Sequence, residues 1–109
     1  MKNVDFRGSS LADLRDFPQP MRREVGYQID QVQHGLDPDD WKPMNTIGAG
    51  VKEVRMRDDS GIYRVFYVAK SGNTVYVLHC FKKKSPKTSK LDKDIGIKRY
   101  KELLKELKT

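Results

Sequence analysis

Apolar and polar residues alternate in three runs in the second half of the chain. The runs cover Val51–Arg57, Ile62–Lys70 and Thr74–Phe81, and turn-forming residues separate them. Because β-branched and aromatic residues dominate each run, the pattern predicts three β-strands. The short turns between the runs favour an antiparallel meander. A weaker alternation over residues 2–7 predicts one further short strand.

Apolar positions recur every three or four residues on either side of these runs, which is typical of helices. A short helix is predicted over Leu11–Phe17 and, after a break marked by prolines, a second one that ends near His34. A third helix is predicted from Ser89 or Asp92 to Lys108. The expected fold class is α+β, with an N-terminal helical hairpin, a three- or four-stranded antiparallel sheet and a C-terminal helix. We expect the helices to cover one face of the sheet.

Length and charge narrow the interpretation. A chain of 109 residues predicts a single domain over residues 1–109. The formal net charge is +7, and residues 82–109 contain 11 Lys and Arg against 4 Asp and Glu, whereas residues 1–81 contain 11 of each. This local excess predicts a surface that faces a polyanion, the alternative being a basic tail without a partner.

Several classes of chemistry have little support in the sequence. Cys80 is the only cysteine, so an internal disulfide is impossible and a reducing compartment fits. The N-terminus has no apolar run of signal-peptide length, and no stretch approaches the ~20 apolar residues of a membrane span. We therefore expect a soluble, cytoplasmic protein. With two histidines and one cysteine, no metal site and no cofactor are expected.

The strands carry charged side chains on one of their two faces. Side chains alternate along a strand, so Arg55, Arg57, Arg64, His79 and Lys83 fall on the face opposite the more apolar set. If the strands align, these residues share one exposed face, the alternative being a solvated face with scattered charges. Arginine and lysine can stabilise the charged phosphorane of RNA cleavage without a metal. A lysine, tyrosine or histidine with a shifted pKa can transfer the protons.

The segment that follows the last strand adds further candidates for nucleic-acid binding. Residues 82–90 contain five lysines and lead into the third helix, whose N-terminal N–H groups predict an anion site. Aromatic side chains near the basic set are suited to stacking on RNA bases. The candidate RNA-binding residues are Arg57, Lys82, Lys84, Lys87, Phe81 and Tyr100.

Four segments carry a resemblance to a known family. SSLADLRDFPQPMRREVGYQI, EVRMR, GIYRVFYV and VYVLHCFKKKSPKT resemble the RelE/ParE toxin superfamily, in particular its phage-related HigB-like subgroup, and the resemblance covers roughly residues 8–106. It implies a toxin of a type II toxin–antitoxin system. RelE and HigB members cleave mRNA in the ribosomal A site, whereas ParE members poison DNA gyrase. The implied partners are a helix-turn-helix antitoxin, the ribosome and mRNA, with operator DNA bound only through the antitoxin complex.

The resemblance also implies roles for individual residues. Arg64, Arg55 and Lys83 match catalytic basic positions, while Glu53 stands where RelE-like toxins have a basic residue. A family tyrosine that should follow the last strand is absent from residues 86–90, so His79 or Tyr100 is expected to replace it. The first hypothesis is a ribosome-dependent mRNA endonuclease, with Arg64, Arg55, Lys83 and His79 as catalytic residues. The alternatives are a non-enzymatic gyrase inhibitor, favoured by Glu53 and the missing tyrosine, and a plain nucleic-acid-binding domain, favoured by charge alone.

Overall fold

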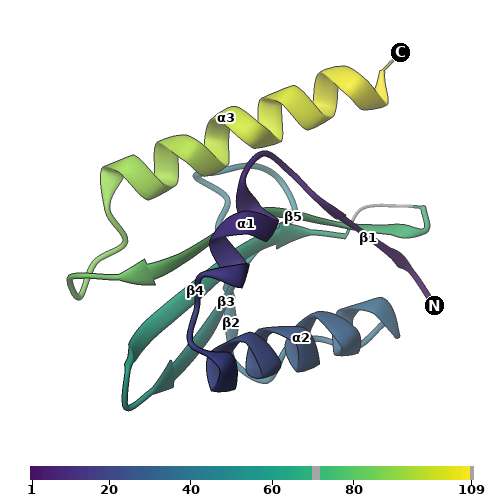
Figure 1. Ribbon diagram of the computed structural model, residues 1–109. Helices are drawn as coiled ribbons and strands as arrows, with labels where there is room; N and C mark the ends of the chain where they lie inside the picture. The colour runs from purple at the N-terminus through teal and green to yellow at the C-terminus, as the bar shows by residue number, and fades with distance from the viewer. Residues whose placement is uncertain (70–71, 109) are drawn as a thin grey trace.

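A five-stranded sheet lies at the centre of the computed structural model, which describes residues 1–69 and 72–108. The spatial order of its strands is β1-β5-β4-β3-β2 (Figure 1). The strands are β1 (Asn3–Phe6), β2 (Trp41–Pro43), β3 (Val51–Asp58), β4 (Gly61–Val68) and β5 (Thr74–Lys83), and the helices are α1 (Ser10–Arg15), α2 (Gln19–Gln33) and α3 (Lys90–Leu107). The α+β class, the N-terminal helix pair and the C-terminal helix are confirmed.

The number and direction of the strands differ from the prediction. The meander of β3, β4 and β5 is antiparallel, as expected, but β1 pairs in parallel with β5. The additional strand, β2, lies in a stretch that reads as a connection, and it pairs at the edge with β3. Its three residues are too few to show an alternating pattern, which is why the sequence does not reveal it. Lys70 and Ser71, placed by the sequence in a strand end and a turn, lie outside the described residues.

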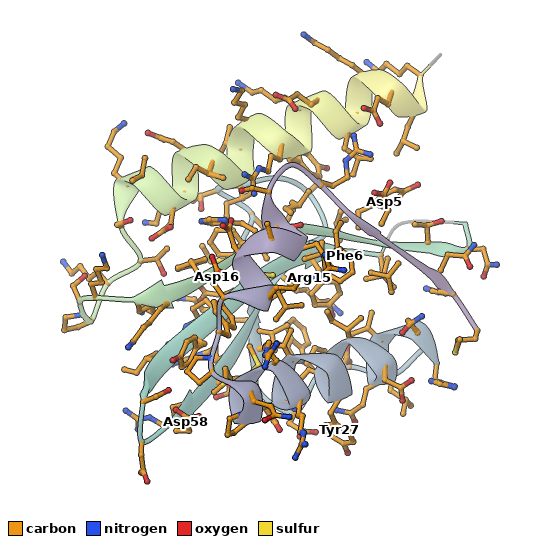
Figure 2. The ribbon with its side chains drawn as sticks, in the orientation of Figure 1. Asp5, Phe6, Arg15, Asp16, Tyr27 and Asp58 are labelled. Atoms are coloured by element: carbon orange, nitrogen blue, oxygen red, sulfur yellow. The ribbon has the colours of Figure 1, made fainter. Side chains whose placement is uncertain are left out.

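Helices cover both faces of the sheet, so the expectation that they cover one face is wrong. Figure 1 shows α2 on one side and α3 on the other. Val25 of α2 belongs to the same buried cluster as Val65, whereas Leu103 of α3 belongs to the cluster of Phe66. Because both faces of β4 are apolar, each needs a helix to exclude water. Tyr27 points away from the sheet on the outer side of α2 (Figure 2) and is 55% exposed.

A β-bulge in the middle of β5 changes which side chains share a face. Phe66 pairs with His79, but the next residue of β4, Tyr67, pairs with Val77, so Leu78 is an extra residue. Both Leu78 and His79 consequently face α3. Strict alternation predicts opposite faces for them, because a pattern of period two cannot include an inserted residue.

Candidate functional site

The strand register brings the predicted basic residues together. Arg55 pairs directly with Arg64, and Arg64 pairs with Phe81 on the other side. Two residues away on β4, Ile62 pairs with Arg57 of β3 on one side and with Lys83 of β5 on the other. Arg57 and Lys83 therefore lie on the same face of the sheet as Arg55 and Arg64. The face is the one that α3 partly covers, whereas the sequence predicted an exposed face without a helix. Which of these residues act in catalysis remains a prediction from the resemblance.

A polar hollow opens at the end of this face that α3 does not cover. Its lining includes Asp40, Ile62 and the arginines Arg55, Arg57 and Arg64. Arg55 and Arg57 are exposed, whereas Arg64 is only 8% exposed and lies deeper. We call this set of three arginines, together with Lys83, the basic face. It is suited to phosphate oxygens because guanidinium groups present several N–H donors to one anion.

The Arg64 side chain is held by neighbouring groups. Its Nη1 donates to the carbonyl oxygen of Tyr63 at 3.0 Å, and its Nε lies 3.7 Å from Oε1 of Glu53. Burial lowers the pKa of Arg64, and the charge of Glu53 opposes that shift. An arginine keeps its proton even so, because its ordinary pKa lies far above neutrality. Arg64 is therefore a partly dehydrated positive charge at a fixed position.

Glu53, which stands where the resemblance implies a basic residue, is buried in the middle of the basic face. The residue is 1% exposed. Its Oε2 accepts a hydrogen bond of 3.0 Å from Oγ1 of Thr88, and its Oε1 lies 3.7 Å from Nζ of Lys42. The sequence showed an acidic residue two positions before Arg55 but gave no sign that it contacts groups on three other segments. This contact set is the part of the site that sequence reasoning missed.

Lys83 is the second residue whose environment changes its chemistry. Its Nζ donates to the carbonyl oxygen of Pro86 at 2.8 Å, and the side chain is only partly exposed. Burial lowers the pKa of Lys83, the positive charge of Arg64 lowers it further, and Glu53 acts in the opposite direction. A lysine with a lowered pKa gives up its proton more readily and is therefore suited to general acid–base catalysis.

The other lysines are placed on different sides of the last strand and its loop. The ammonium of Lys82 lies 5.9 Å from the ring centre of Tyr63, on the face that carries α1 and α2. Lys84 and Lys87 are exposed in the loop between β5 and α3, where they line a second hollow together with Lys82 and Lys83. The loop is thus positively charged and accessible beside the basic face.

Three predicted site residues are packed in the core on the α3 side. His79 is 5% exposed, its Nε2 lies 2.8 Å from Oδ1 of Asp92, and its ring stacks on Phe81 with centroids 4.7 Å apart. Burial lowers the pKa of His79, so the ring is neutral at pH 7 and Nε2–H donates to the carboxylate. The hydroxyl of Tyr100 donates to the carbonyl oxygen of Ala49 at 2.9 Å. Phe81 and Tyr100, 7% and 6% exposed, offer little ring surface to a base.

The sequence predicts an anion site at the N-terminus of α3, but side chains of the helix itself occupy that position. Ser89 caps the helix, because its Oγ accepts from the backbone N–H of Asp92 at 3.1 Å. The carboxylate of Asp92 lies in the first turn and also accepts from Oγ of Ser89 at 2.7 Å. A carboxylate therefore already neutralises the positive end of the helix dipole. The lysines of the loop, rather than the helix end, remain available for phosphate.

Neither a metal-binding cluster nor a membrane-spanning helix is present in the part of the chain that the structure describes. Within residues 1–69 and 72–108, no group of three or more His, Cys, Asp and Glu side chains is arranged to hold a metal ion. In the same part of the chain, none of the helices has both the length and the apolar character needed to cross a membrane.

Comparisons with known proteins place this geometry in a family. Residues 12–101 match the model of a family described as phage-derived protein Gp49-like. None of the curated proteins matches this chain. Among solved structures, the toxin–antitoxin complex RelBE of E. coli aligns with a TM-score of 0.64 at 16% identity, over 78% of this chain and 100% of that chain. The isolated RelE toxin of E. coli aligns with a TM-score of 0.60 at 17% identity, over 98% and 99%.

A third structure extends the same pattern to another organism. The RelBE2 toxin–antitoxin complex of Mycobacterium tuberculosis aligns with a TM-score of 0.55 at 24% identity, over 75% of this chain and 98% of that chain. At identities this low, the structural alignments establish a shared fold. Because the family model covers most of the chain, the protein belongs to the phage-derived Gp49-like family, and its fold is that of the RelE toxins.

Proposed function

We propose that this protein is the toxin of a type II toxin–antitoxin system and inhibits translation by cleaving mRNA on the ribosome. The observation that carries the proposal is the basic face, where Arg55, Arg64 and Lys83 of three adjacent strands lie on one side of the sheet. The shared fold with RelE toxins supports it. The whole chain, residues 1–109, acts as one cytoplasmic domain in this proposal.

The proposed reaction is an attack of the 2′-OH on the neighbouring phosphorus. The hydroxyl loses its proton, the phosphorane gains negative charge, and the 5′ oxygen leaves with a proton, which yields a 2′,3′-cyclic phosphate and a 5′-OH. Arg64 is assigned to the developing charge because its guanidinium is fixed and partly dehydrated. Arg55 binds beside it, and Lys83, with its lowered pKa, is assigned to protonating the leaving oxygen.

None of these three residues is assigned as the base that removes the 2′-OH proton. The sequence suggested His79, but its ring is buried and its Nε2–H is engaged with Asp92. Orientation of the 2′-OH by the ribosome is expected to contribute much of the rate, because a correctly aligned attack replaces a rare bimolecular encounter. In this proposal Arg57, Lys82, Lys84 and Lys87 bind phosphates of the flanking RNA and raise affinity in a salt-dependent way.

The proposed partners follow from the same fold. Two of the similar structures are toxin–antitoxin complexes. We therefore expect a cognate helix-turn-helix antitoxin that covers the basic face, with operator DNA bound only through that complex. An acidic or amphipathic segment would complement the charge and could fold as it binds.

The decisive experiment compares Arg64→Ala with Lys87→Ala on purified translating ribosomes. Losing a donor that is aimed at a transition-state charge costs on the order of a hundredfold or more in rate. Lys87 is exposed on the loop, so its loss should only weaken binding and reduce the salt dependence. Circular dichroism spectra of both variants must match the wild type. Wild-type cleavage rates in folded Arg64→Ala would refute the catalytic assignment.

A second candidate function is inhibition of DNA gyrase without catalysis. The observation that favours it is Glu53, an acidic residue where the cleaving relatives have a basic one. The test adds purified protein to a gyrase supercoiling assay and to the ribosome assay at equal concentrations. Blocked supercoiling without mRNA cleavage would establish the second candidate in place of the first.

A further inference from the structure

Glu53 is a buried carboxylate that has no role in the proposed reaction. An isolated buried carboxylate is strongly unfavourable unless cations or hydrogen-bond donors compensate it. Glu53 is 1% exposed, and its compensating groups come from separate segments: Arg64 of β4, Lys42 of β2, and Thr88 of the loop before α3. A carboxylate with contacts of this kind connects those segments to β3.

The contact with Arg64 fixes the direction of its guanidinium. Nε of Arg64 lies 3.7 Å from Oε1 of Glu53, and no hydrogen bond satisfies this buried Nε within the described residues. Nη1 is directed at the carbonyl of Tyr63 instead. Arg64 also lines the hollow shared with Arg55 and Arg57, and Nη2 is the guanidinium nitrogen that neither contact uses. The buried carboxylate therefore approaches the arginine through Nε and leaves Nη2 for a ligand.

The contact with Thr88 fixes the loop. Thr88 is the last residue but one before α3, and its hydroxyl donates to Oε2 of Glu53 across 35 positions of sequence. The lysines Lys84 and Lys87 lie between β5 and this anchor. Docking Thr88 on the sheet thus determines how far the basic loop can move from the basic face.

The charge of Glu53 also acts on Lys83. Arg64, Lys42 and Arg55 each lower the pKa of Lys83, after burial, whereas Glu53 raises it. Other titratable groups near Lys83 in the hollow formed by the loop and α3 are Lys82, Lys84, Lys87 and Asp92. Removing the carboxylate would leave the cations around Lys83 unopposed.

We propose that Glu53 is a positioning residue that orients Arg64, docks the loop at Thr88 and holds the basic face together without contacting RNA. Its catalytic consequence rests on the proposed function, while its structural consequence can be measured independently. The departure from a basic residue at this position is then part of how this chain builds its site.

The test uses Glu53→Gln, Glu53→Asp and the matched control Thr88→Val. Glutamine keeps the shape and an oxygen acceptor for Thr88 but removes the charge, whereas aspartate keeps the charge and withdraws it by one methylene. Thr88→Val keeps the charge and removes only the hydroxyl donor. NMR of the Arg64 Nε–H group reports on the contact with Arg64, and a pH titration of the Lys83 side chain reports on the charge of Glu53. Neither measurement needs RNA.

Glu53→Gln should shift the Arg64 Nε–H resonance and lower the pKa of Lys83 beyond its wild-type value. Thr88→Val keeps the carboxylate 3.7 Å from Nε of Arg64 and should leave the Arg64 Nε–H resonance unchanged. On ribosomes, Glu53→Gln should lower kcat roughly tenfold to a hundredfold with little change in KM, as expected for a misplaced catalytic group. The high-pH limb of the rate profile should move toward lower pH, and Glu53→Asp should restore part of the rate.

The outcomes separate the two proposals. If the wild type does not cleave mRNA, the proposed function fails, but the NMR measurements still decide whether Glu53 orients Arg64 and whether its charge acts on Lys83. Unchanged Arg64 and Lys83 signals in folded Glu53→Gln overturn the inference even if the rate falls. If Glu53→Gln does not fold, Glu53→Asp replaces it: an unmoved Arg64 resonance in that variant overturns the positioning role.

Discussion

Two glycines in helix interiors provide a test of how closely α3 must approach the sheet. A Cβ added at Gly26 of α2 would meet nothing within 4 Å, whereas one at Gly96 of α3 would lie 3.0 Å from Cδ2 of Phe66 and 3.2 Å from Cδ1 of Ile47. Replacing glycine by alanine in a helix interior gains about 0.8–1.0 kcal/mol. Gly26→Ala should therefore stabilise the protein by nearly that amount.

At Gly96 the same gain is opposed by overpacking. Phe66 is fully buried and Ile47 is 4% exposed, so neither has free space to move into. Inserting a methyl group into a filled core typically costs about 1–3 kcal/mol, which leaves Gly96→Ala between roughly neutral and 2 kcal/mol destabilised. The two variants should differ by about 1–3 kcal/mol, since the helix-propensity gain is common to both.

Urea unfolding at 25 °C, followed by circular dichroism, measures both changes against the wild type. Thermal unfolding provides a check, because 1 kcal/mol corresponds to roughly 4–8 °C in a domain of 60–100 residues. Equal stabilisation by both substitutions would refute the reasoning and show that α3 can rise from the sheet without loss.

Two further predictions concern buried titratable groups. Burial raises the pKa of Cys80 to about 12, so a thiol reagent at pH 8 should modify the folded protein very slowly and the urea-unfolded protein fully; rapid labelling without urea would contradict this. Burial lowers the pKa of His79, so the unfolded state binds the proton more readily, and stability should fall as pH decreases below about 6.5. His79→Gln should reduce the stability difference between pH 7 and pH 5, and an undiminished difference would count against it.

The sequence predicted the central part of the sheet because its three strands are long and their turns short. Arg55, Arg64 and Lys83 were placed on one face from alternation alone, and the register confirms that placement. Hairpin connections leave little freedom in register, so residues of equal parity on neighbouring strands lie together. Predicting that these residues share a face required no information about where the helices lie.

The exposure of a side chain depends on tertiary contacts, which alternation along a strand does not reveal. Alternation indicates which side chains share a face but not which part of the face a helix covers. Phe81 and Tyr100 were therefore assigned to RNA, although α3 and its core enclose both. The bulge at Leu78 is a further case, because no residue in β5 marks the position of an inserted residue.

Glu53 is the residue that bears most directly on the choice between mRNA cleavage and gyrase inhibition. From the sequence, an acidic residue at a position that is basic in cleaving relatives favours gyrase inhibition. In the structure that carboxylate is buried, lies 3.7 Å from Nε of Arg64 and accepts a hydrogen bond from Thr88, so it presents almost no surface to a phosphate. Arg55, Arg57, Arg64 and Lys83 still leave the basic face with an excess of positive charge. An acid at this position is therefore compatible with cleavage, and only the rate on ribosomes, set against gyrase inhibition, distinguishes the two functions.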